Sequence, residues 1–268
     1  IQREWLDAEV VRMSDKTFLT EHWKELECVV FVGAMGICVR TIAPLLDDKY
    51  TDPAVVCVDS TGKYVIPVVS GHIGGANDYS KRIAAILGGE AIITTQSDNL
   101  GLWAIDTFAQ KYGWQTEVDH TRMNLFVYQF VEKKPTALLL DIRDEGTDYL
   151  ERTKPNHVKV FYHLEDIPQD EFELIISVTY RNYPSDAFHK PHLCFYAPVL
   201  HLGFGCRKQC KPDGIVNYIH QEMLDRGVHP LSLSSISSIE LKKDEPLWES
   251  FLNKGYNYEK HIYAVDTL

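Results

Sequence analysis

Residues 65–78 read VIPVVSGHIGGAND, an apolar run that breaks directly into a loop of small and polar residues. The run predicts a buried strand over 64–69, and the spacing after the loop predicts a helix over about 76–87. Glycine lets a ligand approach the backbone closely, and the N-terminus of a helix attracts anions. Because His72 can exchange a proton near neutral pH, we predict anion binding with proton chemistry at this loop.

A structural interpretation of the same loop stays open. Glycine pairs often serve only to let a helix pack closely on a strand, and a loop histidine is often only a hydrogen-bond donor. The loop residues that we expect to contact a ligand are Ser70, Gly71, Gly74, Gly75, Asn77 and Asp78.

On both sides of this loop, short β-rich runs alternate with amphipathic helical segments. The runs at 28–32 and 54–58 predict strands, and the turn residues DSTG at 59–62 predict a hairpin that joins 54–58 to 64–69. Strands that alternate with helices require a mostly parallel sheet. We therefore predict a multi-domain α/β fold with mostly parallel sheets and helices on both faces.

Changes in composition divide the chain into three expected domains. The strand–loop–helix order recurs from 199 (VLHLGFGCRKQC, 199–210), where Gly203 and Gly205 lie at the end of the strand and a helix is expected over about 212–226. The chain stops directly after an expected strand at 261–265, so we expect its last domain to be truncated. The three domains are an N-terminal α/β domain with the glycine loops (1–118), a small middle α/β domain (119–197) and a C-terminal α/β domain (198–268).

Composition excludes several classes of protein. The formal net charge of the 268 residues is −11, which disfavours general nucleic-acid binding but leaves small anionic ligands possible. The chain has no apolar run long enough for a bilayer, and residues 1–16 lack the basic-then-apolar order of a secretory signal. Its six cysteines occur mainly in expected strands and helices. We therefore predict a cytoplasmic protein that binds neither membrane nor nucleic acid. The pair Cys206 and Cys210 lacks the second pair of a zinc site, so we assign no metal.

Two further segments carry candidate ligand residues. Arg40 lies one helical turn beyond Gly36, in a helix that starts at the Gly33 turn, and its guanidinium suits a carboxylate or a phosphate. The alternative is an arginine that is simply solvated.

The segment TTQSDNLG (94–101) follows an expected strand at 91–95, at the edge where open α/β sheets bind ligands. It leads into a helix that we expect over about 100–112. We expect it to bring Thr95, Ser97 and Asp98 to the same crevice as His72. The alternative is that Ser97 and Asp98 only cap the helix that follows.

Glycine patterns exclude three common enzyme classes. Neither glycine cluster completes the dinucleotide fingerprint G-x-G-x-x-G, and the chain contains no phosphate-binding G-x-x-x-x-G-K-[ST]. It also contains no G-x-S-x-G elbow of a serine hydrolase.

Taken together, these segments resemble the CbiG family of cobalamin biosynthesis. The matching stretches are GAMGICVRTIAPLL (33–46), TDPAVV (51–56), VSGHIGGAND (69–78), TTQSDNLGLWAID (94–106), LGFGCRK (202–208) and LKKDEP (241–246). The resemblance implies a cobalt-precorrin-5A hydrolase, which opens the δ-lactone of a tetrapyrrole and releases acetaldehyde to give cobalt-precorrin-5B. It also implies that cobalt belongs to the substrate and that the protein carries no cofactor. Members of the family normally begin with a further β-α unit before the position of residue 28, and they continue beyond residues 263–268 into more of the C-terminal domain. We therefore expect this chain to be truncated at both ends.

Residue chemistry assigns the expected roles. His72 or Asp98 is the base that takes a proton from water, and the backbone N–H groups of 74–77 stabilise the oxyanion. The residues expected to bind the carboxylates of the substrate are Gly33, Gly36, Arg40, Ser70, Gly71, Gly74, Gly75, Asn77, Asp78, Thr95, Ser97, Gly203, Gly205 and Arg207.

Two other functions stay open. One is a non-catalytic module that binds or carries a corrinoid intermediate, and the other is a regulatory domain that recognises anions. For the enzyme, fusion to or association with other enzymes of the corrin pathway also stays open.

Overall fold

The structure is a computed structural model that describes residues 8–12, 16–210, 214–252 and 258–264. The expected start of a helix at 212 and the expected end of a strand at 265 lie outside these residues. The chain divides into two compact units, Ile1–Thr107 and Phe108–Leu268, and each is described here by itself.

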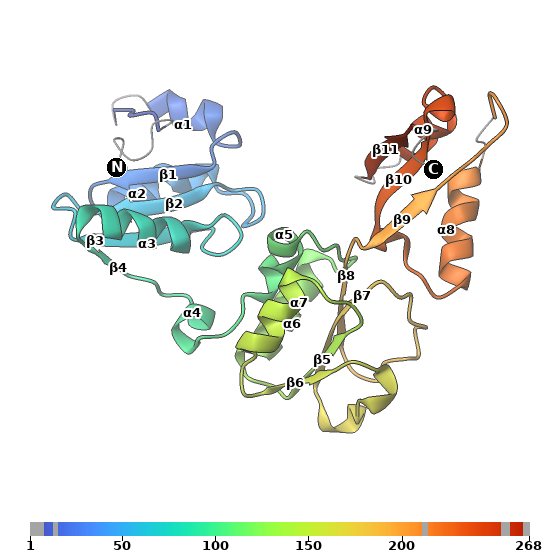
Figure 1. The fold of residues 1–268 in the computed structure, drawn as a ribbon. Helices are drawn as coiled ribbons and strands as arrows, with labels where there is room; N and C mark the ends of the chain where they lie inside the picture. The colour runs from blue at the N-terminus through green and yellow to red at the C-terminus, as the bar shows by residue number, and fades with distance from the viewer. Residues whose placement is uncertain (1–7, 13–15, 211–213, 253–257, 265–268) are drawn as a thin grey trace. The chain divides into compact units, whose positions relative to one another are not determined.

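The first unit is built on a four-stranded sheet with the strand order β1-β2-β3-β4 (Figure 1). Its strands are β1 (Cys28–Val32), β2 (Ala54–Val58), β3 (Tyr64–Val69) and β4 (Glu90–Ala91). The predicted hairpin is confirmed, because β3 runs antiparallel to β2 while the other neighbours are parallel. Asp59 holds the turn by accepting hydrogen bonds from the backbone N–H groups of Thr61 and Tyr64.

Helices cover both faces of this sheet. Ile83 and Ala84 of α3 (Ala76–Leu87) pack against apolar side chains of β2 and β3 on one face. Cys38 and Ile42 of α2 (Met35–Ile42) pack with Trp23, just after α1 (Lys16–His22), on the other. The short helix η1 (Ala43–Leu45) follows α2.

The predicted long helix over 100–112 is wrong. The segment instead forms α4 (Gln96–Leu100), η2 (Ile105–Thr107) and α5 (Phe108–Tyr112). Gly101, with φ 63°, ends α4, and its N–H donates to the carbonyls of Ser97 and Asp98. Glycine favours this left-handed end because it has no Cβ.

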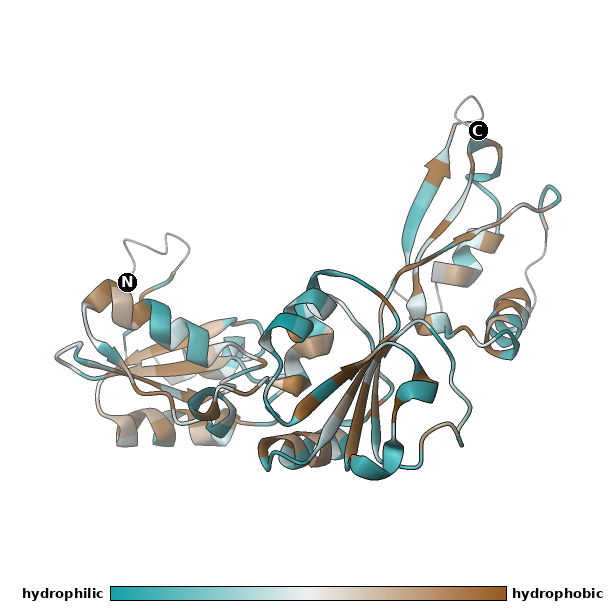
Figure 2. Ribbon diagram, turned by 60° about the horizontal axis from the view of Figure 1, so that its bottom comes forward, coloured by the Kyte–Doolittle hydropathy of each residue, from teal (hydrophilic) through white to brown (hydrophobic). Residues whose placement is uncertain are grey.

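The second unit begins with a fully parallel sheet in the order β6-β5-β7-β8. Its strands are β5 (Thr136–Leu140), β6 (Val158–Phe161), β7 (Leu174–Thr179) and β8 (His192–Tyr196), and its helices are α6 (His120–Val131), α7 (Glu145–Thr153), η3 (Leu164–Asp166) and η4 (Gln169–Glu171). β5 and β7 are buried along their whole length, and Figure 2 shows brown, hydrophobic stretches in the strands of this sheet. Helix α7 was not predicted, although Asp144 and Thr147 form a capping box at its start.

A parallel three-stranded sheet, in the order β11-β10-β9, follows in the same unit. Its elements are β9 (Leu200–Gly203), α8 (Ile215–Asp225), η5 (Pro230–Ser232), β10 (Leu233–Ile239), η6 (Glu240–Lys242), α9 (Leu247–Leu252) and β11 (Glu259–Tyr263). Trp248 and Phe251 of α9 pack with Val216 of α8 and with β10. The predicted α/β class with mostly parallel sheets is thereby confirmed, while the division at 118 and 197 stays a prediction.

No helix in the part of the chain that the structure describes is both long and apolar enough to cross a membrane.

The buried parallel sheet of the second unit provides a test of the core. Leu138 is 0% exposed, and we expect Leu138→Ala to lower the free energy of unfolding by about 2–5 kcal/mol, because it removes buried methyl groups and leaves a cavity. The measurement is urea denaturation of the whole chain. Leu241→Ala is the matched control, since Leu241 is 74% exposed and should change the value by less than about 0.5 kcal/mol. Equal losses in the two variants would contradict this account of the core.

Candidate functional site

The loop that carries His72 is shaped by close packing of its own backbone. A Cβ at Gly74 would lie 2.5 Å from Cβ of Ser70, which is closer than real Cβ atoms approach. It would also lie 3.2 Å from the backbone N of Ala54, which is a tight contact. A Cβ at Gly71 would lie 2.9 Å from Oδ1 of Asn77. Ser70 is buried, and its hydroxyl donates to the carbonyl of Asp52. The structural interpretation therefore accounts for Ser70, Gly71 and Gly74.

The backbone N–H groups after the loop are already bonded. Those of Gly75, Ala76 and Asn77 donate to the carbonyls of His72, Ser70 and Gly71 at 3.0, 3.1 and 3.0 Å. Gly75 caps α3 with φ 82°, a conformation that glycine adopts readily. These three N–H groups are therefore engaged within the loop, and the expected oxyanion site at 74–77 stays a prediction.

His72 is held by Asp98. Its Nε2 lies 2.8 Å from Oδ2 of Asp98, and the two side chains are 22% and 25% exposed. The contact forms because β3 and β4 are parallel, so the loop after β3 and the segment after β4 meet at one edge of the sheet. The 94–101 segment therefore contacts His72, as expected, while its role in binding a ligand stays a prediction.

Asp98 gathers further donors around its carboxylate. Oδ2 accepts hydrogen bonds from Thr95 Oγ1 at 2.7 Å and Asn77 Nδ2 at 2.9 Å, and Lys81 Nζ lies 3.3 Å from Oδ1. Burial alone raises the pKa of Asp98, but the hydrogen bonds from Thr95, His72 and Lys81 outweigh burial and hold the pKa at about 2. Asp98 is therefore ionised at neutral pH and is unsuited to act as the base.

The contact with Asp98 assigns the proton on His72. An ionised carboxylate only accepts hydrogen bonds, so Nε2 of the neutral imidazole carries the hydrogen and Nδ1 keeps its lone pair. We find no hydrogen-bond partner for Nδ1 among the residues that the structure describes. Ser97 Oγ lies 3.2 Å from the same Nε2 that faces Asp98, so these residues do not form a serine relay, which needs both ring nitrogens.

The other glycine turn of the first unit lies at the opposite edge of the sheet. Val32 pairs with Val58 at the carboxyl end of β2, whereas Val69 pairs with Val55 near its start. The structure therefore does not bring Gly33, Gly36 and Arg40 together with His72. Arg40 is exposed, and its guanidinium donates to the carbonyl of Gly36 at 3.1 Å.

The remaining candidates are exposed. The side chain of Asp78 is 84% exposed and lies 3.6 Å from Lys81. Gly203, Gly205 and Arg207 belong to the second unit, where a Cβ at Gly205 would meet no heavy atom within 4 Å.

Sequence reasoning missed Lys81. It lies four residues after Asn77 on α3, so the two side chains share one face of the helix and both reach Asp98. Helical spacing from Asn77 was the signal that could have identified this lysine.

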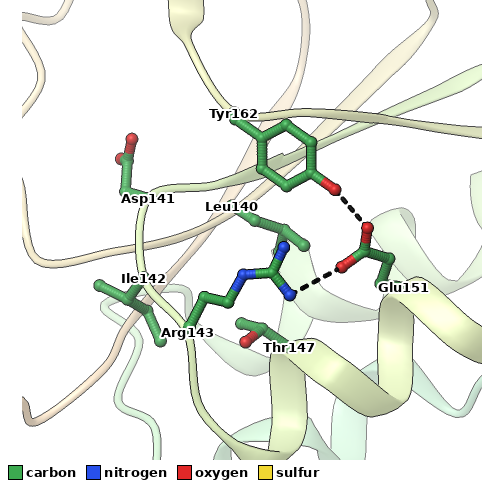
Figure 3. Close-up of a pocket in the computed structure, with 7 residues that line it drawn as sticks. All are labelled: Leu140, Asp141, Ile142, Arg143, Thr147, Glu151 and Tyr162. Atoms are coloured by element: carbon green, nitrogen blue, oxygen red, sulfur yellow. Dashed lines mark hydrogen bonds and ion pairs between the residues drawn. The ribbon is translucent and has the colours of Figure 1, made fainter.

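A small pocket of about 130 Å³ lies at the end of β5 in the second unit. Figure 3 shows Arg143 and Tyr162 both directed at Glu151 of α7, and Arg143 also contacts Asp148 at 3.2 Å. Pockets for drug-sized ligands measure about 300–1,000 Å³, so this one is too small for a tetrapyrrole. Its cation is already paired with two carboxylates.

The cysteines and possible metal ligands form no centre in the described ranges. All six cysteines are free, and no group of three or more His, Cys, Asp or Glu side chains that could hold a metal ion occurs there.

This geometry defines the class of protein: an α/β protein in which an ionised carboxylate fixes an imidazole at the edge of a sheet. Family models described as cobalamin synthesis G N-terminal, cobalamin biosynthesis central region and cobalamin synthesis G C-terminus match residues 17–98, 103–196 and 200–268 in order. The chain belongs to the CbiG family.

Two curated relatives of the chain have the same name, cobalt-precorrin-5A hydrolase. The chain is 31% identical to the cobalt-precorrin-5A hydrolase of Priestia megaterium over 93% of this chain and 66% of that protein. It is 31% identical to the cobalt-precorrin-5A hydrolase of Salmonella typhimurium over 81% of this chain and 61% of that protein. The chain thus spans less than two thirds of the length of these two relatives.

One solved structure is also similar. A cobalamin biosynthesis protein G homologue from Sulfolobus solfataricus aligns with 98% of this chain and 73% of its own, at a TM-score of 0.46 and 21% identity.

The packing at Gly74 gives a test of the loop. We expect Gly74→Ala to lower the free energy of unfolding of the first unit by about 1–3 kcal/mol, because the added methyl group overlaps Ser70 and Ala54. Gly36→Ala is the matched control, since its Cβ would meet only the end of Arg40 at 3.6 Å. Thermal and urea unfolding measure both, and a harmless Gly74→Ala would show that packing does not shape the loop.

The low pKa of Asp98 gives a pH test. Ionised Asp98 stabilises the fold above its ordinary pKa of 3.8, and this contribution is lost as the pH falls toward about 2. We therefore expect the stability of Asp98→Asn to fall less steeply than that of the parent chain between pH 4 and 2. Asp78→Asn, at a carboxylate that is 84% exposed, should keep the parent slope in urea unfolding at each pH. Identical slopes for Asp98→Asn and the parent would contradict the assignment.

Proposed function

We propose that this chain is the cobalt-precorrin-5A hydrolase of cobalamin biosynthesis, which opens the δ-lactone of the substrate and releases acetaldehyde to give cobalt-precorrin-5B. Its family membership and the names of its relatives support the proposal. The observation that carries it is the His72–Asp98 contact of 2.8 Å, because lactone hydrolysis requires a base for water.

His72 is the general base in this proposal. Its Nδ1 takes a proton from water as the water oxygen attacks the lactone carbonyl, and Asp98 stabilises the imidazolium that forms. Asp98 acts through His72, so its role is positioning and electrostatic stabilisation. When the tetrahedral intermediate collapses, the C–O bond of the lactone breaks and the imidazolium returns the proton to the ring oxygen. In the retro-aldol cleavage that follows, the freed alcohol loses its proton and forms the C=O bond of acetaldehyde. The C–C bond to the macrocycle breaks, and the macrocycle keeps that electron pair and takes up a proton.

The proposed reaction also indicates what the protein binds. The substrate is a tetrapyrrole edged with acetate and propionate groups, and Arg207 supplies a positive charge for them. Cobalt belongs to the substrate, and the proposal gives the protein no metal or cofactor of its own. The six free cysteines fit a reducing cytoplasm as the site of the reaction.

Substitution of the base tests the proposal. We expect His72→Ala to lower the rate of acetaldehyde release from cobalt-precorrin-5A by about 10²–10⁴-fold, the usual contribution of a general base. Asp98→Asn should also lower the rate, because an amide does not stabilise the imidazolium. Acetaldehyde is measured by coupling to alcohol dehydrogenase.

His22→Ala is the matched control, since His22 lies in the same unit and its side chain is 44% exposed, pairs with Glu25 and contacts the ring of Phe18. It should keep the parent rate. Full activity in His72→Ala would reject His72 as the base. Tight corrinoid binding by the parent protein with no acetaldehyde would favour a carrier module instead.

A further inference from the structure

The basic turn at 207–210 follows β9 in the second unit. The N–H of Cys210 donates to the carbonyl of Arg207 at 3.2 Å, which closes a four-residue turn with Lys208 and Gln209 at its tip. Gln209 has φ 53°, in the left-handed region that residues with a Cβ rarely adopt. A conformation of this kind persists only where the surrounding structure holds it.

The start of this segment is anchored at Phe204. Its N–H donates to the carbonyl of Ser237 at 3.0 Å, and its carbonyl accepts from Ser238 Oγ at 2.8 Å. Its ring packs edge-on against Trp248, with ring centroids 4.7 Å apart. The chain therefore leaves β9 in a fixed direction.

The end of the segment is anchored by Glu245, which is 8% exposed. Its Oε2 accepts from the N–H of Gln209 at 2.6 Å, and the N–H of Cys210 also bonds to this carboxylate. Its Oε1 lies 3.1 Å from Nζ of Lys242, which keeps the nearly buried charge paired. Glu245 thus bonds the residue whose backbone is strained.

The turn presents two positive charges to solvent. Arg207 and Lys208 are exposed, and neither side chain makes an ion pair or a hydrogen bond with any residue that the structure describes. Gly205 has a negative φ and open space around it, so packing does not require glycine there. Glycine at this position leaves the backbone open to a ligand.

We propose that Glu245, paired with Lys242, positions the 207–210 turn so that Arg207 and Lys208 bind carboxylate groups of an anionic ligand. This inference rests on the proposed function, in which the carboxylates are the acetate and propionate groups at the edge of the tetrapyrrole. Glu245 is a positioning residue, since it bonds the turn and not the ligand.

The direction in which one substitution changes the affinity distinguishes a positioning role of Glu245 from a simple effect of its charge. Glu245→Gln removes a negative charge close to the turn, so long-range electrostatics alone would strengthen the binding of an anion. Positioning has the opposite consequence, because the amide breaks the pair with Lys242 and presents one acceptor oxygen in place of two. The affinity should therefore fall although the turn keeps both of its cations.

The experiment titrates the whole chain with uroporphyrin, a porphyrin that carries acetate and propionate groups, and follows the fluorescence of the probe. We expect the double variant Arg207→Gln/Lys208→Gln to bind about two- to thirty-fold more weakly and with a smaller dependence on salt. Glu245→Gln should weaken binding in the same direction. Lys243→Gln, at an exposed lysine just before Glu245 in the chain, should change the affinity by less than about two-fold.

Unchanged or tighter binding by Glu245→Gln, with the circular dichroism and melting temperature of the parent, would overturn the positioning role. If Glu245→Gln fails to fold, Arg207→Gln at an exposed side chain decides the anion site, and parent affinity there would overturn it. The probe has no lactone, so a failure of acetaldehyde release leaves this result untouched and the two proposals are tested separately.

Discussion

The candidate site depends on the close approach of the backbone at Gly74 to Ser70 and to the start of β2. This contact folds the segment after β3 back on itself, so that its carbonyls accept the first N–H groups of α3. His72 is therefore carried on a loop whose polar backbone groups are largely satisfied within the loop. A side chain held in this way keeps its geometry without a ligand.

The surrounding hydrogen bonds and charges give the imidazole of His72 and the carboxylate of Asp98 different roles. Both side chains are about three quarters buried, yet Asp98 receives donors from four residues, and its pKa is held at about 2. The imidazole donates through Nε2 to this fixed charge, which leaves Nδ1 as the basic atom. Lys81 balances the carboxylate, so the cluster does not accumulate negative charge.

The glycines of the two units serve different purposes. A Cβ at Gly74 would collide with Ser70 and lie tightly against the start of β2, and a Cβ at Gly71 would displace the side-chain oxygen of Asn77. At Gly205 a side chain would meet open space, and Glu245 bonds the backbone of the neighbouring charged turn. The same residue type thus secures packing in one loop and leaves room beside a charged turn in the other.

Periodicity and turn residues were sufficient to locate β1, β2, β3 and α3 at their observed bounds, because these signals are local. The sequence also placed His72 and Asp98 in one crevice, since both follow strands. It could not show that a left-handed glycine at 101 divides the expected helix, or that α7 forms behind a capping box. Hydrophobic spacing is weak in such short elements.

By itself, the sequence determined the alternation of strands and helices, the residues able to exchange protons and the family resemblance, all of which depend on residue types and spacing along the chain. Only the tertiary structure decided which groups meet. The antiparallel turn of β3 moves the loop of His72 to the edge opposite Arg40, and the fold brings Glu245 to the turn at 207–210 from far along the chain. Such contacts arise from strand direction and packing in three dimensions, which residue spacing does not encode.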